Sequence, residues 1–165
     1  MENQAEEQDI KKLRNLIDEV NIAMLVTKHE DHLHSRPMAT SDVDDEGNIW
    51  FFTNEFSDKI DQLEHDPHVS VSYSNPTKNT YIAIRGIAGL VTDKAKLEEL
   101  YTPAIKAWFP NGLDDPKLAL LKVKTEQAEY WDSSSSKMVT VFNILKAVVT
   151  GEKYDAGDHG KINLR

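Results

Sequence analysis

Short runs of alternating hydrophobic and polar residues fill the middle of the chain. They predict β-strands at residues 22–27, 32–43, 49–53, 69–73, 80–92, 118–124 and 127–132. Turn-forming residues at 28–31, 44–48 and 75–79 separate successive strands, which indicates antiparallel pairing. Gly86 and Gly89 interrupt the longest of these strands and indicate a β-bulge or a sharp coil. Six or seven such strands predict a small closed β-barrel.

Hydrophobic residues at three- and four-residue spacing predict helices at both ends of the barrel. The first, over residues 6–20, would lie on the barrel through a hydrophobic stripe of Ile10, Leu13, Leu16, Ile17 and Val20. Shorter helices are predicted at 57–65, at 94–101 with Asp93 as N-cap, and at 103–109. The pattern at 138–149 favours a C-terminal helix, although its β-branched residues leave a strand open.

A length of 165 residues fits one domain, so we predict a single domain over residues 1–165. Residues 1–5 and 151–165 are expected to be extended or flexible ends, since the tail offers little to bury. Residues 133–136, all serine, are expected to form a flexible joint.

Composition narrows the class of protein. No apolar run approaches the roughly 20 residues that span a bilayer, and the acidic start differs from a secretory signal, so a cytoplasmic protein without membrane contact is expected. The absence of cysteine excludes disulfide, thiol and zinc–thiolate chemistry. A net charge of −9 argues against binding to nucleic acid. An anionic ligand would therefore need a local basic pocket.

One candidate pocket lies where the strand ending at Thr53 runs through a tight loop into the helix that starts at Ser57. The free N–H groups of a helix start attract anions, and the Ser57 hydroxyl and the Lys59 ammonium would add a donor and a charge. Phosphate is the natural occupant. The alternative is that Ser57 only caps its helix and Lys59 is solvated.

Arg36 strengthens the phosphate interpretation. With a period of two, it shares a strand face with His34, Met38 and Thr40 and is presented inside a half-buried strand. Arginine is rarely buried unless it is paired, and a phosphate fits its planar fork. The alternative is a surface arginine that pairs with Asp42 or Asp44.

Other residue types give weaker signals. The aromatic residues could stack on a flat ring, but most are expected to be core: Trp50, Phe51, Phe52, Tyr73, Tyr81, Trp108, Phe109 and Trp131. His32 and His34 share a strand face without an evident third ligand, so no metal site is predicted. No side chain stands out as an acid or a base, so catalytic residues stay unassigned.

The segments around Arg36 and Ser57 have a sequence that resembles a known family. Ser35-Arg-Pro-Met38, followed by Trp50-Phe-Phe-Thr-Asn-Glu-Phe-Ser-Asp-Lys59, resembles the flavin-binding split barrels of the pyridoxamine 5′-phosphate oxidase-like superfamily. Trp108-Phe-Pro110, Ala128-Glu-Tyr-Trp-Asp132 and Thr150-Gly151 resemble its general stress protein 26 branch. The resemblance spans nearly the whole chain.

The resemblance implies a cofactor and its ligands. Arg36, Ser57 and Lys59 would hold the phosphate of flavin mononucleotide (FMN), with FAD less favoured. Further residues would line the site, as the resemblance implies: Pro37, Met38, Phe52, Thr53 and Asn54. Asp58 stands where the family has an arginine. Flavin sites in this family form at a dimer interface, so a homodimer is implied, with Trp108 and Phe109 as our candidates for the part that the second subunit supplies.

The departures from the oxidase limit the activity. The chain lacks the C-terminal Arg-x-His motif that grips the pyridoxal substrate and ends in Lys161-Ile-Asn-Leu-Arg165, so vitamin B6 oxidation is not predicted. The leading hypothesis is a flavin-dependent oxidoreductase with a stress role that takes electrons from NADH or NADPH. The alternatives are a flavin-storing or flavin-sensing module without turnover, and a haem or deazaflavin binder.

Overall fold

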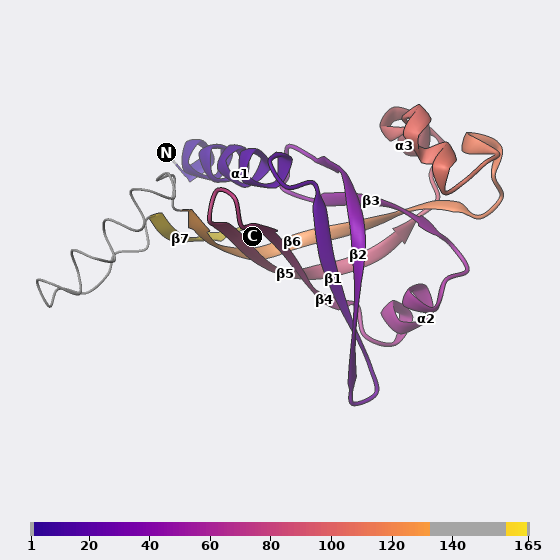
Figure 1. Ribbon diagram of the computed structural model, residues 1–165, viewed down its shortest axis with the longest axis horizontal. Helices are drawn as coiled ribbons and strands as arrows, with labels where there is room; N and C mark the ends of the chain where they lie inside the picture. Colours follow the sequence, from indigo (N-terminus) through magenta and orange to yellow (C-terminus); the bar gives the residue numbers. More distant parts are fainter. Residues whose placement is uncertain (1, 133–157, 165) are drawn as a thin grey trace, which may run out of the picture.

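The structure is a computed structural model that describes residues 2–132 and 158–164. Its strands are β1 (Ile22–His29), β2 (His32–Val43), β3 (Ile49–Asn54), β4 (His68–Asn75), β5 (Thr80–Val91), β6 (Leu118–Asp132) and β7 (Asp158–Asn163). Its helices are α1 (Glu2–Asp18), α2 (Asp58–His65) and α3 (Lys94–Leu100), with 3-10 turns η1 (Pro103–Ala107) and η2 (Gly112–Asp114). Figure 1 shows the strands forming one body with the helices around it.

Six strands close into an antiparallel barrel. Their order is β3-β2-β1-β4-β5-β6, and β6 pairs back with β3. Along β6, one edge pairs with β5, while the other edge is shared by β3 at its start and by β7 at its end. The predicted mainly β barrel is confirmed, as a closed six-stranded barrel with one extra strand.

The barrel core follows from the alternation in the sequence. Inward positions of β4 and β5 are buried at every second residue, and α1 lies against the barrel through its predicted stripe (Figure 1). The largest fully buried side chains are Leu13, Ile17, Leu25, Ile49, Phe51, Val71, Tyr73, Ile82, Ile84, Leu120, Leu121 and Ile162. A second, smaller cluster lies outside the barrel, where Trp50, Leu97, Leu118 and Leu120 pack under α3 and η1.

Three expectations about the ends and the last strands are wrong. Residues 2–5 are helical, because α1 begins at Glu2. Two predicted strands are one continuous β6, whose extra residue at a bulge, Glu126, accepts the N–H of Leu164 through its carbonyl. Residues 158–164 of the tail are not a free end: β7 pairs with β6, and Ile162 and Leu164 are 1% and 7% exposed, while residues 151–157 lie outside the described residues.

The bulge itself was predicted. The register between β5 and β6 shifts at Arg85 and Gly86, as the glycine indicated. The predicted serine joint at 133–136 and the predicted helix at 138–149 lie outside the described residues. Among the helices of the described ranges, none is long and apolar enough to cross a membrane.

The expectation that most aromatic residues are core holds only in part. Trp50, Phe51 and Tyr73 are buried, and Phe52 and Phe109 are half-buried. Three others are exposed: Tyr81, Trp108 and Trp131. The exposed three lie on the outward side of the sheet or in the connection before β6, where a hydrophobic ring meets solvent instead of the barrel core.

A candidate flavin-phosphate site

The connection between β3 and α2 is a tight turn that brings a helix start to the end of a strand. The Asn54 side chain accepts the N–H of Phe56 at 2.9 Å, and the Asn54 carbonyl accepts the N–H of Ser57 at 3.2 Å. Ser57 is the N-cap residue, with extended backbone (φ −85°, ψ 153°). The N–H of Ile60 bonds to the Ser57 carbonyl at 2.9 Å, whereas the N–H groups of Asp58 and Lys59 at the helix start have no acceptor among the described residues. The Asn54 amide is thus a turn-forming group.

Two hydroxyl groups at this turn are buried without a hydrogen-bond partner among the described residues. They belong to Thr53 and Ser57. The hydroxyl of Ser57 makes no capping bond to its helix, so the interpretation of Ser57 as a simple cap does not account for it. A buried hydroxyl without a partner costs free energy, and a ligand with acceptor oxygens would satisfy it.

Arg36 lies on β2 opposite Leu25 of β1 and is half-buried. Its Nη1 donates to Thr27 Oγ1 and its Nη2 donates to Gln62 Oε1, both at 2.9 Å. Thr27 Oγ1 in turn donates to Gln62 Oε1 at 2.6 Å. Asp44, the alternative partner, is engaged elsewhere, since it accepts hydrogen bonds from Trp50 Nε1 and from its own turn. Among the described residues, Arg36 bonds to Thr27 and Gln62 and to neither Asp42 nor Asp44, so the surface-pair alternative for Arg36 is wrong.

Two positive charges lie close together at the site. Burial lowers the pKa of Lys59, the positive charge of Arg36 lowers it further, and the carboxylate of Asp58 acts in the opposite direction. Burial also lowers the pKa of Arg36, again opposed by Asp58. Desolvated like charges repel each other, so an anion bound between them would be stabilised.

The remaining predicted site residues spread over three surroundings. Met38 is half-buried against the barrel core, and Pro37 is exposed on the other face of β2. The Phe52 side chain packs on the second cluster, on the opposite face of β3 from Thr53, and Phe109 packs on that cluster too. Trp108 is 71% exposed. The fold thus brings the charges of Arg36 and Lys59 near each other on β2 and α2, the helix that Ser57 caps, and holds Phe52 and Phe109 outside the barrel.

Sequence reasoning missed Thr27 and Gln62. Thr27 is 1% exposed and occupies an inward position of β1 after Ala23 and Leu25. A polar residue in this apolar series was the sequence signal for a buried hydrogen bond. Gln62 is 9% exposed and lies on α2 between the buried Ile60 and Leu63. Buried polar side chains are usually hydrogen-bonded, so both positions required a partner.

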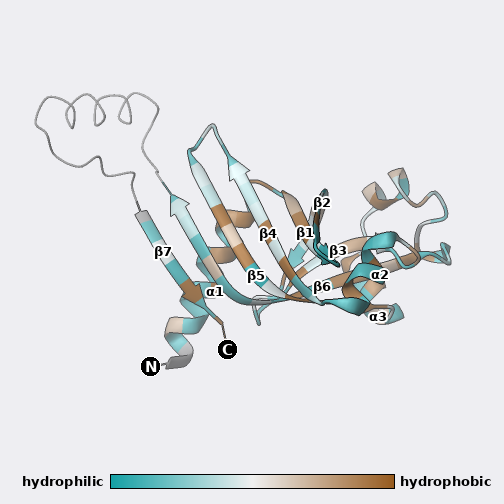
Figure 2. Cartoon of the chain, turned by 90° about the horizontal axis from the view of Figure 1, so that it is seen from below, coloured by the Kyte–Doolittle hydropathy of each residue, from teal (hydrophilic) through white to brown (hydrophobic). Residues whose placement is uncertain are grey.

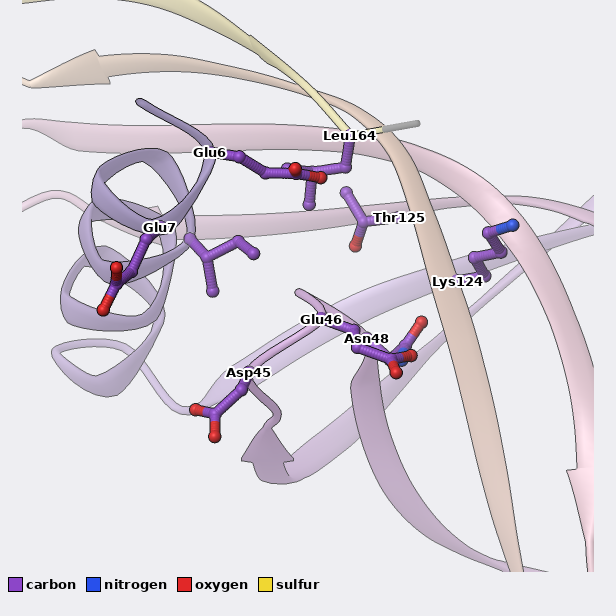
Figure 3. A pocket seen from close by; sticks show the side chains of 9 residues that line it. Glu6, Glu7, Asp45, Glu46, Asn48, Lys124, Thr125 and Leu164 are labelled. Atoms are coloured by element: carbon purple, nitrogen blue, oxygen red, sulfur yellow. The ribbon is translucent and has the colours of Figure 1, made fainter. Parts of the chain in front are cut away.

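A separate hollow of about 470 Å³ lies between α1 and the turn that joins β2 to β3 (Figure 3). It is lined by Glu6, Glu7, Ile10, Asp45, Glu46, Asn48, Lys124, Thr125 and Leu164. Its four carboxylates would repel a phosphate, and its single lysine does not offset them. In residues 2–132 and 158–164, no group of three or more acidic or histidine side chains is arranged to hold a metal ion.

Comparison with known proteins gives related chains along most of the sequence. Protein bli-3 of Neurospora crassa is 29% identical over 157 residues, which cover 88% of this chain and 75% of that protein. A putative general stress protein 26 from Jannaschia sp. CCS1 has 26% identity and a TM-score of 0.75, over 94% of this chain and 99% of that one. The general stress FMN/FAD binding protein of Xanthomonas citri has 29% identity and a TM-score of 0.69, over 78% and 92%.

The family model described as "Pyridoxamine 5′-phosphate oxidase like" matches residues 8–155, which include the barrel strands β1–β6 and the turn that carries Ser57 and Lys59. The sequence motifs, the closed antiparallel barrel and this match agree, and the chain belongs to the pyridoxamine 5′-phosphate oxidase-like family.

Proposed function

We propose that this chain binds FMN, with the phosphate at the start of α2 between Arg36, Ser57 and Lys59. The proposal rests on two observations: the half-buried cations Arg36 and Lys59 act on each other, and the N-cap of the helix that carries Lys59, Ser57, has a buried hydroxyl with no partner among the described residues. Membership of the family and the FMN/FAD binding relative support it. A phosphate dianion would relieve the repulsion between the cations and accept the free donors.

Other residues would hold the isoalloxazine ring. The family resemblance puts the ring along residues 36–38 and 52–53, where Met38 offers apolar contact and Thr53 a hydroxyl that no described residue satisfies. The Phe52 side chain lies on the far face of β3, so its main chain is the part that would face the ring. Bound flavin supplies hydride and electron transfer, while these residues orient it and exclude water.

Charge removal tests the phosphate site. Arg36→Ala and Lys59→Ala should each weaken FMN binding roughly 10- to 100-fold, since a hydrogen bond to a charged group is worth about 1.5–3 kcal/mol. Flavin fluorescence quenching measures the dissociation constant, with FAD titrated in parallel. Arg14→Ala, which removes a guanidinium bound to Asp45, and Lys94→Ala, at the start of α3, are matched controls that should leave binding unchanged. Unchanged FMN affinity in both Arg36→Ala and Lys59→Ala would show that the phosphate does not bind at this site.

We further propose a homodimer in which the outward face of the sheet is buried. Ile22, Met24, Tyr81 and Trp131 are 37–51% exposed. Met24 is opposite Ser72, and Ser72 is opposite Ala83, so the β1 and β5 residues share that face. Figure 2 shows the strands of this face in the order β4, β5, β6 and β7, with Tyr81 of β5 directly opposite Trp131 of β6 in the pairing register. The exposed Trp108 is our candidate for a side chain that reaches the flavin of the partner subunit.

Light scattering tests the dimer. The wild type should elute at twice the chain mass, and Met24→Asp should shift it toward the monomer and weaken FMN binding, because a charge would be buried in the interface. Leu113→Asp, at an equally exposed apolar residue of η2, should leave the mass unchanged. A monomeric wild type with full FMN affinity would refute this part of the proposal.

The reaction we favour is flavin-dependent oxidoreduction with NADH or NADPH as electron donor, in a stress response. Anaerobic addition of NADH or NADPH to the FMN-loaded chain should bleach the flavin absorbance near 450 nm within minutes. The median turnover number of enzymes is about 10 s⁻¹, so even a much slower reduction would be complete in that time. Tight FMN binding without bleaching by either nicotinamide would support the alternative, a storage or sensing module. A chain that stays colourless after incubation with FMN and gel filtration would overturn both.

A further inference from the structure

Arg36 is held in place by two side chains from two other elements. Thr27 belongs to β1 and Gln62 to α2, and each accepts one hydrogen bond from the guanidinium at 2.9 Å. The Thr27 hydroxyl also donates to Gln62 Oε1 at 2.6 Å, which closes a three-membered network. Thr27 and Gln62 are 1% and 9% exposed, so water competes little for these bonds.

The network fixes the direction of the donors that remain. A guanidinium has five N–H groups in one plane, and two of the five point at Thr27 and Gln62, which leaves three for a ligand. Arginine carries large rotamer entropy, and a fork already held in one orientation loses less of it when a ligand binds.

Both partners are neutral. A carboxylate at either position would pair with Arg36 and cancel the charge that an anion needs, whereas an amide oxygen and a hydroxyl orient the guanidinium and leave its charge in place. Gln62 and Lys59 both lie on α2, and Ser57 is the N-cap of that helix. The hydrogen bond from Arg36 to Gln62 therefore ties the β2 cation to the helix that carries Lys59.

We propose that Gln62 and Thr27 are positioning residues that hold the Arg36 guanidinium toward the phosphate of the flavin. The inference rests on the proposed function, because it requires that the anion bound at Arg36 is the FMN phosphate. Neither side chain contacts the flavin itself; both act through Arg36.

The test compares FMN with riboflavin, which has the same ring and no phosphate. Gln62→Leu and Thr27→Val should each weaken FMN binding about 10-fold, as expected for a misplaced charged hydrogen bond, and leave riboflavin binding unchanged. Gln62→Glu should also weaken FMN selectively, since its carboxylate would neutralise Arg36. Thr27→Ser keeps the hydroxyl and should restore the affinity. In an Arg36→Ala background, Gln62→Leu should have no further effect.

Gln127→Leu is the matched control, because Gln127 is also hydrogen-bonded, to Asn163 at 2.7 Å, but on β6. Equal loss of FMN and riboflavin affinity in Gln62→Leu, or loss of neither, would overturn the inference while the proposed function stands. If Gln62→Leu fails to fold, the FMN and riboflavin affinities of Thr27→Val and Thr27→Ser are compared instead, and the same outcomes support or overturn the inference. A wild type that binds neither flavin, or binds both equally, refutes the phosphate site and this inference with it.

Discussion

Lys59 is a half-buried ammonium group beside a second cation, Arg36. Its pKa is lowered from the ordinary 10.5, so the folded chain binds this proton less readily than the unfolded chain does. Between the lowered pKa and 10.5 the unfolded state carries more protons, and stability rises with pH in that window. Below the lowered pKa, the protonated lysine destabilises the flavin-free fold.

We therefore predict that Lys59→Met stabilises the flavin-free chain at neutral pH although it weakens FMN binding. The methionine fills a similar volume and removes the desolvated charge. Differential scanning fluorimetry of the flavin-free proteins measures the midpoint, and the advantage of Lys59→Met should shrink as the pH approaches 10.5. A midpoint below that of the wild type at neutral pH would show that Lys59 is paired in the flavin-free state.

Asp58 determines the net charge that the site offers. It is exposed and opposes the effect of burial on both Arg36 and Lys59. Asp58→Asn should tighten FMN binding by roughly 2- to 5-fold at low salt, the size of a solvent-screened charge interaction, and leave riboflavin binding unchanged. The gain should fade in high salt. Weaker binding would mean that the Asp58 carboxylate itself orients a cation.

Among individual residues, the sequence predicts the candidate phosphate ligands better than it predicts the residues that position them. Arg36, Ser57 and Lys59 follow from a strand face and a helix start, which are local patterns. Thr27 and Gln62 could not be assigned, because their role depends on contacts between β1, β2 and α2 that no local pattern contains.

Gly86 is the residue at which β5 and β6 shift register. A Cβ at this position would meet the main-chain carbonyl oxygen of Lys124, which cannot rotate away. Gly86→Ala should therefore cost about 1–3 kcal/mol of stability, the range for overpacking, measured by urea unfolding. Gly89→Ala is the control on the same strand: its Cβ would meet nothing within 4 Å, so a change below about 0.5 kcal/mol is expected. Equal stability of the two variants would contradict the close approach of β5 and β6 at the bulge.

Strand identity was readable from alternation, whereas strand continuity and the tail were not. Thr125 and Glu126 break the hydrophobic pattern because the bulge lies there, so one strand looked like two. In the described part of the tail, residues 158–164, the buried hydrophobic residues are Ile162 and Leu164, and the strand forms because the far end of β6 has an edge that β3 leaves open. Such an edge follows from the assembled barrel and not from the residues of the tail.

At the scale of the whole molecule, the number of strands and their pairing produce the closed barrel. The candidate site lies where β2 pairs with β3 least. Pairing between β2 and β3 covers only residues 40–43 of β2, so among the described strands the stretch that carries Arg36 pairs with β1 alone. A cation on this stretch is accessible from the barrel edge and from α2. The family was predictable from the motifs, but the cytoplasmic location and the homodimer stay predictions.

A crystal structure of this chain with FMN tests the central claim most directly. We predict the phosphate within about 2.7–3.2 Å of the Arg36 guanidinium, the Ser57 hydroxyl and the Lys59 ammonium, with Gln62 and Thr27 still bonded to Arg36. Flavin density with its phosphate away from the start of α2, or a well-ordered chain that excludes FMN at saturating concentration, would contradict the account.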